Sequence, residues 1–380
     1  MVALPYELFR WGEGVKMIQQ HYYTRERKGI FSRTPGYDTV AKSKGLYEGF
    51  ITSTLQGMCF YEAPASLAGE EDTLKYPRAL FCVNTEDDKM IIGQSVFAGK
   101  DYTGQRNRYF THNYIISEDE RDKYIANPDR IIYSSGFARE YDIEKGMVIS
   151  EVSEIARSKN DDCFNSIEEL FLATGMNIEL FTNLIKACFD SAQYGKKIYI
   201  VLDSESNKVT ELAKGMLKYL YRGLPFAVRR KIGFITYMKE PRMKDLINIV
   251  FLCKGSIKRL TTEIKAGYVF DLASKNFYLD GMDEEKDIFT HFVMDNIENG
   301  ETLNDFFYKA DKSCIEDKLS ISEYEGLLQP IEEKKTNVKV TEETKKEFED
   351  KESVNYDPVE VSSIWKKIIN FIEKLIFKKI

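Results

Sequence analysis

The hydrophobic pattern of this 380-residue chain changes its period near Cys163, and that change restricts the possible folds more than any other feature. Before it, short segments alternate apolar and polar residues, which is the period of a half-buried β-strand. After it, apolar residues recur every three or four positions between short apolar runs, which is typical of helices that alternate with strands. We therefore predict a mixed α+β and α/β fold, with a β-rich N-terminal domain and an α/β second domain.

The N-terminal half contains several segments with the strand period. Residues 17–23 predict a first strand, and residues 77–83 and 90–97 predict a pair of strands around a polar turn. Residues 109–116 alternate strictly and predict a further strand. In contrast, residues 38–54 begin with side chains that can cap a helix, so a helix is predicted there.

The second half follows a β-α-β order, which predicts a small sheet with a right-handed crossover. Asn177 can cap a helix with a wide apolar stripe, and Gly195 can end that helix. The other predicted strands lie at residues 197–202, 231–237, 246–253 and 268–272, and the other predicted helices at 208–221, 224–228, 284–297, 303–309 and 320–328.

The length of the chain exceeds one typical core, and its composition suggests where to divide it. We predict two domains, at residues 1–155 and 156–330. Residues 331–358 hold many charges and few apolar side chains, which predicts a disordered charged linker. Residues 359–380 regain a wide apolar face and predict a separate amphipathic helix.

The predicted C-terminal helix needs a surface to pack against, because a short isolated helix is marginal in water. A protein surface is one alternative, and a lipid interface with lysines toward anionic headgroups is the other. Lysines interrupt the segment too often for it to span a bilayer. The candidate docking residues are the apolar Ile364, Trp365, Ile368, Phe371, Ile372 and Leu375 and the basic Lys366, Lys367, Lys378 and Lys379.

Arg106, Asn107, Arg108 and His112 concentrate polar chemistry where the strand at 109–116 begins. His112 shares its strand face with two aromatic residues and an isoleucine, so we expect a core histidine that anchors the preceding loop. A catalytic role would need a nucleophile or a partner carboxylate, and no motif supplies one. We therefore predict no catalytic residues and name these four residues as candidate partner contacts.

The sequence does not predict a metal or a cofactor. Its three histidines and six widely spaced cysteines lack metal-ligand spacing. Residues 203–208 connect a predicted strand to a helix, as a phosphate-binding loop does, but they contain no glycine and carry two carboxylates. The sequence also has no signal-like N-terminus and no run of 18 apolar residues, so we expect a cytoplasmic protein, attached peripherally to a membrane if the tail binds lipid.

Basic residues are dense between residues 218 and 244. They raise the alternative of a phosphate or nucleic-acid site, but a net charge of −7 and modest aromatic interleaving favour a solvated or partner-docking face. Arg222, Arg229 and Arg230 are the candidate partner contacts from this cluster.

Two stretches resemble a known family. Gln105-Arg-Asn-Arg-Tyr-Phe-Thr-His112 is similar to a Gly-Arg-x-Gly-Asn-Tyr-Phe-x-His pattern in bacterial GTPase-associated proteins, with departures at Gln105 and Arg108, where that pattern has glycine. Leu224-Pro-Phe-Ala-Val-Arg-Arg-Lys-Ile-Gly-Phe-Ile-Thr-Tyr237 is similar to the middle region of the same family. The resemblance spans roughly residues 15–280. It implies a cytoplasmic adaptor with a GTPase partner, in multi-component defence systems, without a known catalytic reaction.

Three functional hypotheses follow. The preferred one is a non-catalytic adaptor or regulatory component of a GTPase-linked complex, whose tail docks on a membrane or a partner. The first alternative is a nucleic-acid-binding or enzymatic defence effector, although nucleic acid is not the expected partner. The second alternative is a membrane-acting effector that works through the C-terminal helix.

Overall fold

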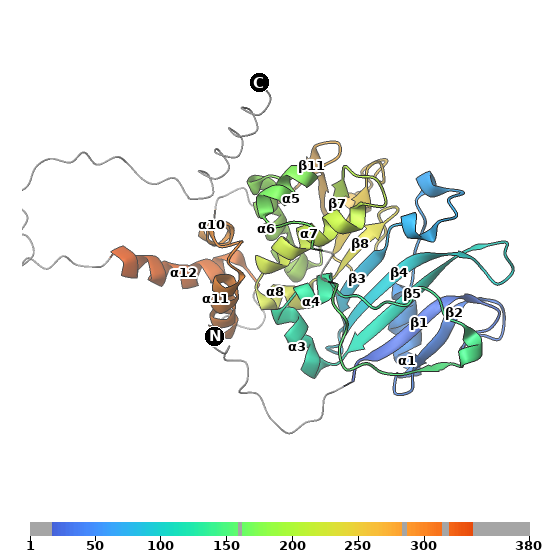
Figure 1. The fold of residues 1–380 in the computed structure, drawn as a ribbon. Helices are drawn as coiled ribbons and strands as arrows, with labels where there is room; N and C mark the ends of the chain where they lie inside the picture. The colour runs from blue at the N-terminus through green and yellow to red at the C-terminus, as the bar shows by residue number, and fades with distance from the viewer. Residues whose placement is uncertain (1–16, 159–161, 283–286, 314–318, 337–380) are drawn as a thin grey trace, which may run out of the picture.

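The strands of both halves join one mixed sheet. In the computed structural model, which describes residues 17–158, 162–282, 287–313 and 319–336, the sheet has 11 strands in the order β11-β10-β7-β9-β8-β3-β4-β5-β1-β2-β6 (Figure 1). This sheet and its flanking helices confirm the predicted fold class. The strands are β1 (Gln19–Glu26), β2 (Gly36–Ser43), β3 (Ala79–Asn84), β4 (Met90–Lys100), β5 (Asn107–Ile116), β6 (Val148–Ile149), β7 (Ile198–Leu202), β8 (Phe234–Met238), β9 (Ile249–Cys253), β10 (Tyr268–Asp271) and β11 (Asn276–Tyr278).

The N-terminal half is antiparallel from β3 through β4, β5 and β1 to β2. The four strands predicted there are confirmed as β1, β3, β4 and β5. The helix predicted at residues 38–54 is wrong in its first part, because residues 36–43 form β2. The antiparallel ladder with β1 outweighs the local capping signal. Helical structure begins only at Glu48, as α1 (Glu48–Phe50), η2 (Ile51–Leu55) and α2 (Gln56–Met58).

The second half is parallel: β10, β7, β9 and β8 run in one direction, so their carboxyl ends share one edge of the sheet. The strands β7, β8 and β9 are buried almost throughout, as strands covered on both faces are. The predicted cap is confirmed, since the Asn177 side chain accepts a hydrogen bond from the Leu180 N–H at 2.8 Å. The helices of this half are α5 (Ile167–Thr174), α6 (Ile178–Tyr194), α7 (Val209–Arg222), α8 (Phe226–Lys231) and α9 (Thr262–Lys265).

The two halves meet where β3 pairs antiparallel with β8 through Phe81 and Cys82. Gly233 stands at this crossing. A Cβ added there would lie 2.2 Å from the Leu246 carbonyl oxygen and 2.9 Å from the Cys82 carbonyl oxygen. Only glycine allows the backbones to approach so closely. The sheet therefore continues without a break between two separate stretches of sequence.

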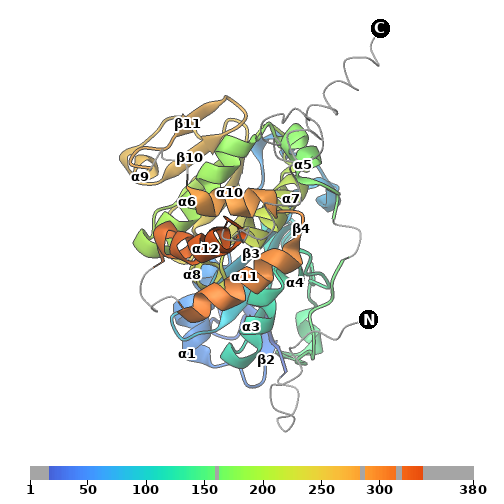
Figure 2. The same ribbon diagram turned by 90° about the vertical axis from the view of Figure 1, so that its left-hand side faces the viewer.

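A layer of three helices covers α6, α7 and α8 on the side away from β1 and β2 (Figures 1 and 2). These helices are α10 (Ile288–Asp295), α11 (Gly300–Ser313) and α12 (Ile321–Thr336). The predicted domain boundary falls at residue 330, but α12 continues through Pro330 to Thr336. Proline removes one backbone donor from this helix without ending it.

Shorter elements complete the described chain: α3 (Glu118–Ala126), α4 (Asp129–Ile132), η3 (Ala65–Leu67), η4 (Thr73–Lys75) and η5 (Ile143–Lys145). Of these, α3 and α4 lie against α8 and α7 and so reinforce the junction of the halves. Within residues 17–336, apart from the three short gaps, no helix is long and apolar enough to cross a membrane. The predicted C-terminal helix at 359–380, and the predicted linker from residue 337 onward, lie outside the described residues.

Candidate functional site

The candidate residues of the β4–β5 hairpin divide between the surface and an ion pair. Arg106 and Asn107 are exposed where β5 begins. Arg108 is half-buried, and its guanidinium pairs with Glu26 of β1 at 2.8 Å. Arg106 and Asn107 can therefore approach a partner directly, whereas Arg108 would first have to leave its ion pair with Glu26.

Asp101 fixes the conformation of the hairpin turn. Its carboxylate accepts hydrogen bonds from the Thr103 hydroxyl at 2.6 Å and from the Arg25 side chain at 3.0 Å. These bonds, of which the one from Thr103 contributes most, hold the pKa of Asp101 well below its usual range. The exposed residues Arg106 and Asn107 therefore follow a turn whose conformation is fixed by a charged carboxylate.

His112 lies in the core, 1% exposed, as expected from its strand face. Its Nδ1 accepts a hydrogen bond from the Ala138 N–H at 3.0 Å, so the ring proton resides on Nε2. In the described part of the chain, Nε2 has no hydrogen-bond partner and faces an aromatic shell. The ring centroids of Tyr22 and Tyr114 lie 4.6 Å and 4.3 Å from that of His112. His112 therefore anchors the segment 135–141, and its predicted role in anchoring the hairpin loop is wrong.

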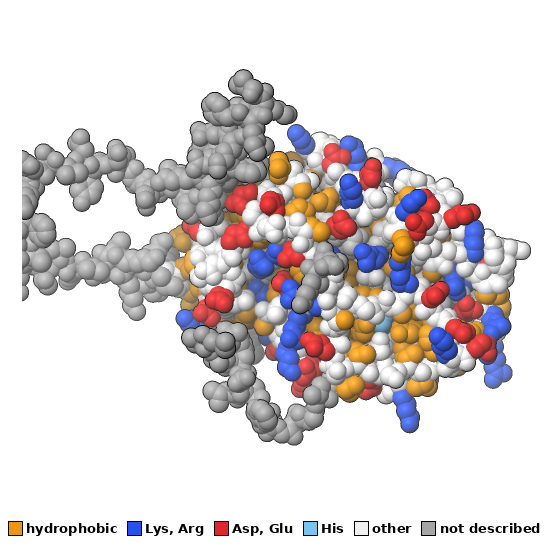
Figure 3. Space-filling view, in the orientation of Figure 1, with side chains coloured by type: hydrophobic (Ala, Val, Ile, Leu, Met, Phe, Trp, Pro, Cys, Tyr) orange, Lys and Arg blue, Asp and Glu red, His pale blue; other side chains and the backbone are white. Residues whose placement is uncertain are grey.

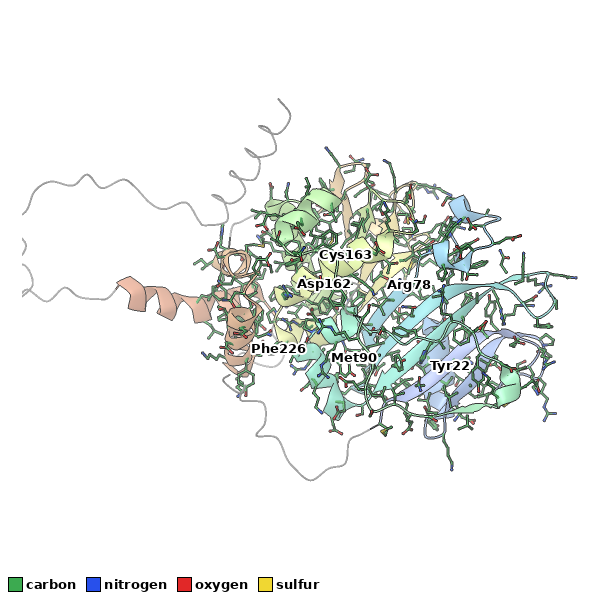
Figure 4. All side chains as sticks on the ribbon, in the orientation of Figure 1. Tyr22, Arg78, Met90, Asp162, Cys163 and Phe226 are labelled. Atoms are coloured by element: carbon green, nitrogen blue, oxygen red, sulfur yellow. The ribbon has the colours of Figure 1, made fainter. Side chains whose placement is uncertain are left out.

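Burial also removes His112 from acid–base chemistry. It lowers the pKa of the imidazole to about 3, so the ring is neutral near pH 7 and a poor proton acceptor. Figure 3 shows hydrophobic side chains gathered over this part of the sheet, on the face where Figure 4 labels Tyr22. The polar ring is one member of an aromatic cluster, which is a packing arrangement rather than a catalytic one.

A second histidine belongs to a polar network on the opposite face of the sheet. His21 Nε2 lies 2.8 Å from the Thr39 hydroxyl, and the Asn113 amide donates to His21 Nδ1 at 2.9 Å and to Cys59 Sγ at 3.3 Å. A nucleophilic Cys–His pair would need a thiolate and an imidazolium. Burial opposes both, since it raises the pKa of Cys59 to about 12 and lowers the pKa of His21 to about 3.

Arg229 was predicted as a partner contact, and that prediction is wrong because its side chain is 1% exposed. The guanidinium donates to the carbonyl oxygens of Leu224 at 2.7 Å and Ile125 at 2.9 Å. It also lies over the rings of Phe226, labelled in Figure 4, and Phe307. Carbonyl oxygens and ring faces replace water around this charge. Arg229 thereby joins α3, α8 and α11 in the core.

The two remaining candidates of the basic cluster, Arg222 and Arg230, and the nearby Lys218 do not form one free surface in the described structure. Arg222 is half-exposed and lies over an aromatic ring with its centroid 5.4 Å away. Arg230 is half-exposed and pairs with Asp122 at 3.2 Å. Lys218 is 5% exposed and pairs with Asp162 at 2.8 Å. Arg222 and Arg230 remain candidate partner contacts, on a surface much less basic than the sequence suggests.

A cavity of about 180 Å³, which no sequence pattern predicts, lies at the seam between the two halves. It lies where β8 ends, at the carboxyl edge of the parallel strands. A hydrogen bond from the Tyr237 hydroxyl to the Glu62 carbonyl oxygen joins the two sides of the cavity. These two residues are 175 positions apart in the sequence, so their spacing gives no sign of the cavity. The N-terminal half contributes Phe60, Tyr61, Glu62, Ala79 and Tyr109, and the second half contributes Tyr237, Met238, Lys239 and Arg242.

Positive side chains of the loop after β8 lie on one side of the cavity, which we call the seam cavity. Arg242 forms an ion pair with Glu62, and Lys239 is half-exposed in the lining. Lys244 lies 4.7 Å from the ring centroid of Phe60 and donates to the Gly57 carbonyl oxygen at 3.0 Å. Three cations therefore lie close to one carboxylate, which leaves the mouth of the cavity net positive.

Residues 203–208, which the sequence compared with a phosphate-binding loop, lie at the same edge of the sheet. There Asp203 pairs with Lys254 at 2.9 Å, so the first position after β7 carries a neutralised carboxylate. This arrangement gives no cradle for phosphate. The candidate tail residues between Ile364 and Lys379 lie outside the described residues.

Comparison with known proteins finds a matching family model for each half of the chain. Residues 17–155 match the family model of GTPase-associated protein 1, N-terminal domain type 2, and residues 169–274 match that of GTPase-associated protein 1, middle domain. No curated protein matches the chain. The two matched ranges meet at the β3–β8 pairing, so the seam cavity takes its lining from both.

Proposed function

The chain belongs to the GTPase-associated protein 1 family, and from this premise we propose that it is a non-catalytic adaptor that binds a GTPase within a multi-component assembly. The state of the reactive side chains carries the proposal. His21 and His112 are buried with pKa values lowered to about 3, and burial raises the pKa of Cys59, Cys82 and Cys188. These groups are held in their unreactive neutral forms near pH 7.

The continuous sheet supports an adaptor because it fixes both halves as one platform. The pairing of β3 with β8, and the Arg229 side chain that reaches from α8 to α3, resist relative motion of the halves. A rigid platform binds a partner without a large ordering cost. At one end of this platform, Arg106 and Asn107 are exposed and available for polar contacts.

Two finer elements of the proposal rest on the family resemblance and on the tail. We place the adaptor in a bacterial defence system, and we expect residues 359–380 to localise the assembly on a partner or a membrane surface. The nucleic-acid alternative loses support because Lys218 and Arg229 are buried and Arg230 is ion-paired.

Affinity purification of the full chain from its native host tests the adaptor role. We expect a GTPase to be recovered with the wild-type chain and to be lost or strongly reduced with the double variant Arg106→Glu/Asn107→Asp, because reversed charge at a polar rim weakens encounter and docking. The matched control is Lys265→Glu, an exposed charge reversal on α9 in the other half.

The purification is repeated with GDP and with a non-hydrolysable GTP analogue. Recovery of the chain without a GTPase in every nucleotide state would overturn the adaptor role. Equal recovery of the GTPase by the double variant and by the control would retain the adaptor role but move its contact surface away from the hairpin.

A further inference from the structure

We propose that the seam cavity is a binding site for a small planar aromatic molecule that carries a negative charge. The inference goes beyond the adaptor role and does not depend on it, because it rests on the walls, size, charge and position of the cavity. It assigns a ligand class to the junction of the two matched domains.

The walls of the seam cavity are rich in aromatic rings. Tyr61, Tyr109 and Tyr237 contribute from both halves, and their hydroxyls already donate to backbone carbonyl oxygens at 2.8, 2.9 and 3.1 Å. The polar ends of these side chains are therefore satisfied by the protein. The half-buried rings of Tyr109 and Phe60 expose the most aromatic surface to a ligand, over the buried rings of Tyr61 and Tyr237. Ring surface favours a flat aromatic guest, which stacks or packs edge-to-face.

The size of the cavity fits one ring system. Its volume is about 180 Å³. For scale, an apolar cavity of about 150 Å³ binds benzene. The buried linings Tyr61, Ala79 and Tyr237 are each less than a tenth exposed, so the inner wall excludes water from an inserted ring. A single or fused ring fits this space, whereas a protein surface does not enter it.

The charge of the ligand follows from the loop after β8. This loop places Lys239 and Arg242 at the cavity, but directs its carboxylate Glu240 away, to Lys258 at 3.8 Å. Glu62 is the carboxylate in the lining, and it is already paired with Arg242. Lys239 is thus the cation with which an anionic group of the ligand would pair. Lys244, above Phe60, adds to the positive field.

The position of the cavity agrees with how α/β proteins bind small molecules. Ligands of open α/β sheets bind outside the carboxyl ends of the strands, and pockets occur preferentially between domains. The seam cavity meets both conditions, because it lies at the end of β8 and takes its lining from both halves. The cavity lining contains no nucleophilic cysteine and no histidine, so we propose binding and no chemical step.

Calorimetric titration of the full chain with a small panel of probes tests the site. The anionic probes are adenosine 5′-monophosphate and indole-3-carboxylate, which separate a phosphate from a carboxylate as the charged group. The neutral counterparts are adenosine and indole, and inorganic phosphate carries charge without a ring. We expect at least one aromatic anion to bind with a dissociation constant below about 1 mM, at least about tenfold more tightly than its neutral counterpart and than phosphate.

Two variants connect such binding to the seam cavity. Lys239→Gln should weaken the anion by about tenfold or more and leave the neutral probe unchanged, and Ala79→Leu should abolish binding of both by filling the space. Lys254→Gln is the matched control, because Lys254 is an exposed lysine that lies at the same edge of the sheet and pairs with Asp203. This variant should bind the probes as the wild type does.

The proposal is overturned if no aromatic anion binds below about 1 mM, if the neutral counterpart binds equally well, or if Lys239→Gln and Lys254→Gln behave alike. Thermal unfolding of each variant is measured in parallel. If Ala79→Leu does not fold, the comparison of Lys239→Gln with Lys254→Gln still decides the outcome, because neither lysine side chain is buried.

Discussion

In the antiparallel half most buried polar side chains lie within the strands, whereas in the parallel half most lie on helices or in loops around strands that are largely apolar. His21, Thr111 and Asn113 belong to β1 and β5 and are fully buried. By contrast, Lys218 lies on α7 and Arg229 on α8. Polar groups of the first half therefore bond mainly between strands, as Asn113 does to His21, and those of the second half mainly between a helix and a loop, as Lys218 does to Asp162.

The sign of the buried charges also differs between the halves. In the described residues, the buried charged side chains of the antiparallel half are carboxylates and those of the parallel half are cations. Lys197 illustrates the second kind, because its ammonium donates to the carbonyl oxygens of Lys244, Asp245 and Ile247 at 2.7, 3.1 and 2.6 Å. The buried carboxylates of the antiparallel half are Glu26, Asp38 and Asp101. The buried cations of the parallel half are Lys186, Lys197, Lys214, Lys218 and Arg229.

This comparison shows why residue type alone does not predict whether a polar side chain is buried or exposed. A polar strand with a histidine suggested a functional site, and a run of basic residues suggested a surface. In both cases the decisive partners, such as the Ala138 N–H at His112 and the Ile125 carbonyl oxygen at Arg229, come from distant segments.

The largest expected effect comes from removing a buried cation of the parallel half. Arg229→Met should lower the free energy of unfolding by about 3–5 kcal/mol, because carbonyl oxygens of Leu224 and Ile125 lose their donor in the core. The neighbouring Arg230→Met should cost about 0–1 kcal/mol, because Arg230 pairs with Asp122 near the surface. Urea unfolding measures both, and similar costs would show that Arg229 is not a core anchor.

A smaller effect is expected at the junction of the halves. Gly233→Ala should lower the free energy of unfolding by about 2–3 kcal/mol, because the new Cβ would meet the carbonyl oxygens of Leu246 and Cys82. The matched control Gly57→Ala lies on α2 in open space and should change stability by no more than about 1 kcal/mol, in the stabilising direction. A neutral Gly233→Ala would mean that the β3–β8 crossing is loosely packed.

Acid should lower the stability of the fold through the two buried histidines of the antiparallel half, since the matched middle domain contains no histidine. Burial lowers the pKa of His21 and His112 to about 3, whereas an unfolded histidine titrates near 6.5. Between these values the unfolded state binds more protons, so stability falls as the pH falls. Each histidine should contribute up to about 1.4 kcal/mol per pH unit in this window.

The pH prediction is measured by urea unfolding between pH 6.5 and 4.5 on the wild type and on His112→Gln. The variant should show a shallower decline with falling pH, because the carboxylates common to both chains cancel in the difference. The exposed His291→Gln is the matched control. Parallel declines in the wild type and His112→Gln would contradict a buried neutral imidazole.

Local patterns were sufficient for much of the fold and for little of the site. The alternation at residues 109–116 and the capping side chain of Asn177 report local geometry, and both predictions held. The strand β2 was missed because its formation depends on pairing with β1. The seam cavity was missed for the same reason, since Phe60 and Lys239 meet only after two distant segments join one sheet.

The central claim, that the chain is an adaptor for a GTPase, is tested most directly by sedimentation velocity of the purified full chain with the GTPase recovered from its host. The experiment is run nucleotide-free, with GDP and with a non-hydrolysable GTP analogue. We predict a stoichiometric complex with a dissociation constant of about 1 µM or tighter in at least one nucleotide state. Independent sedimentation of the two proteins in all three states would contradict the claim.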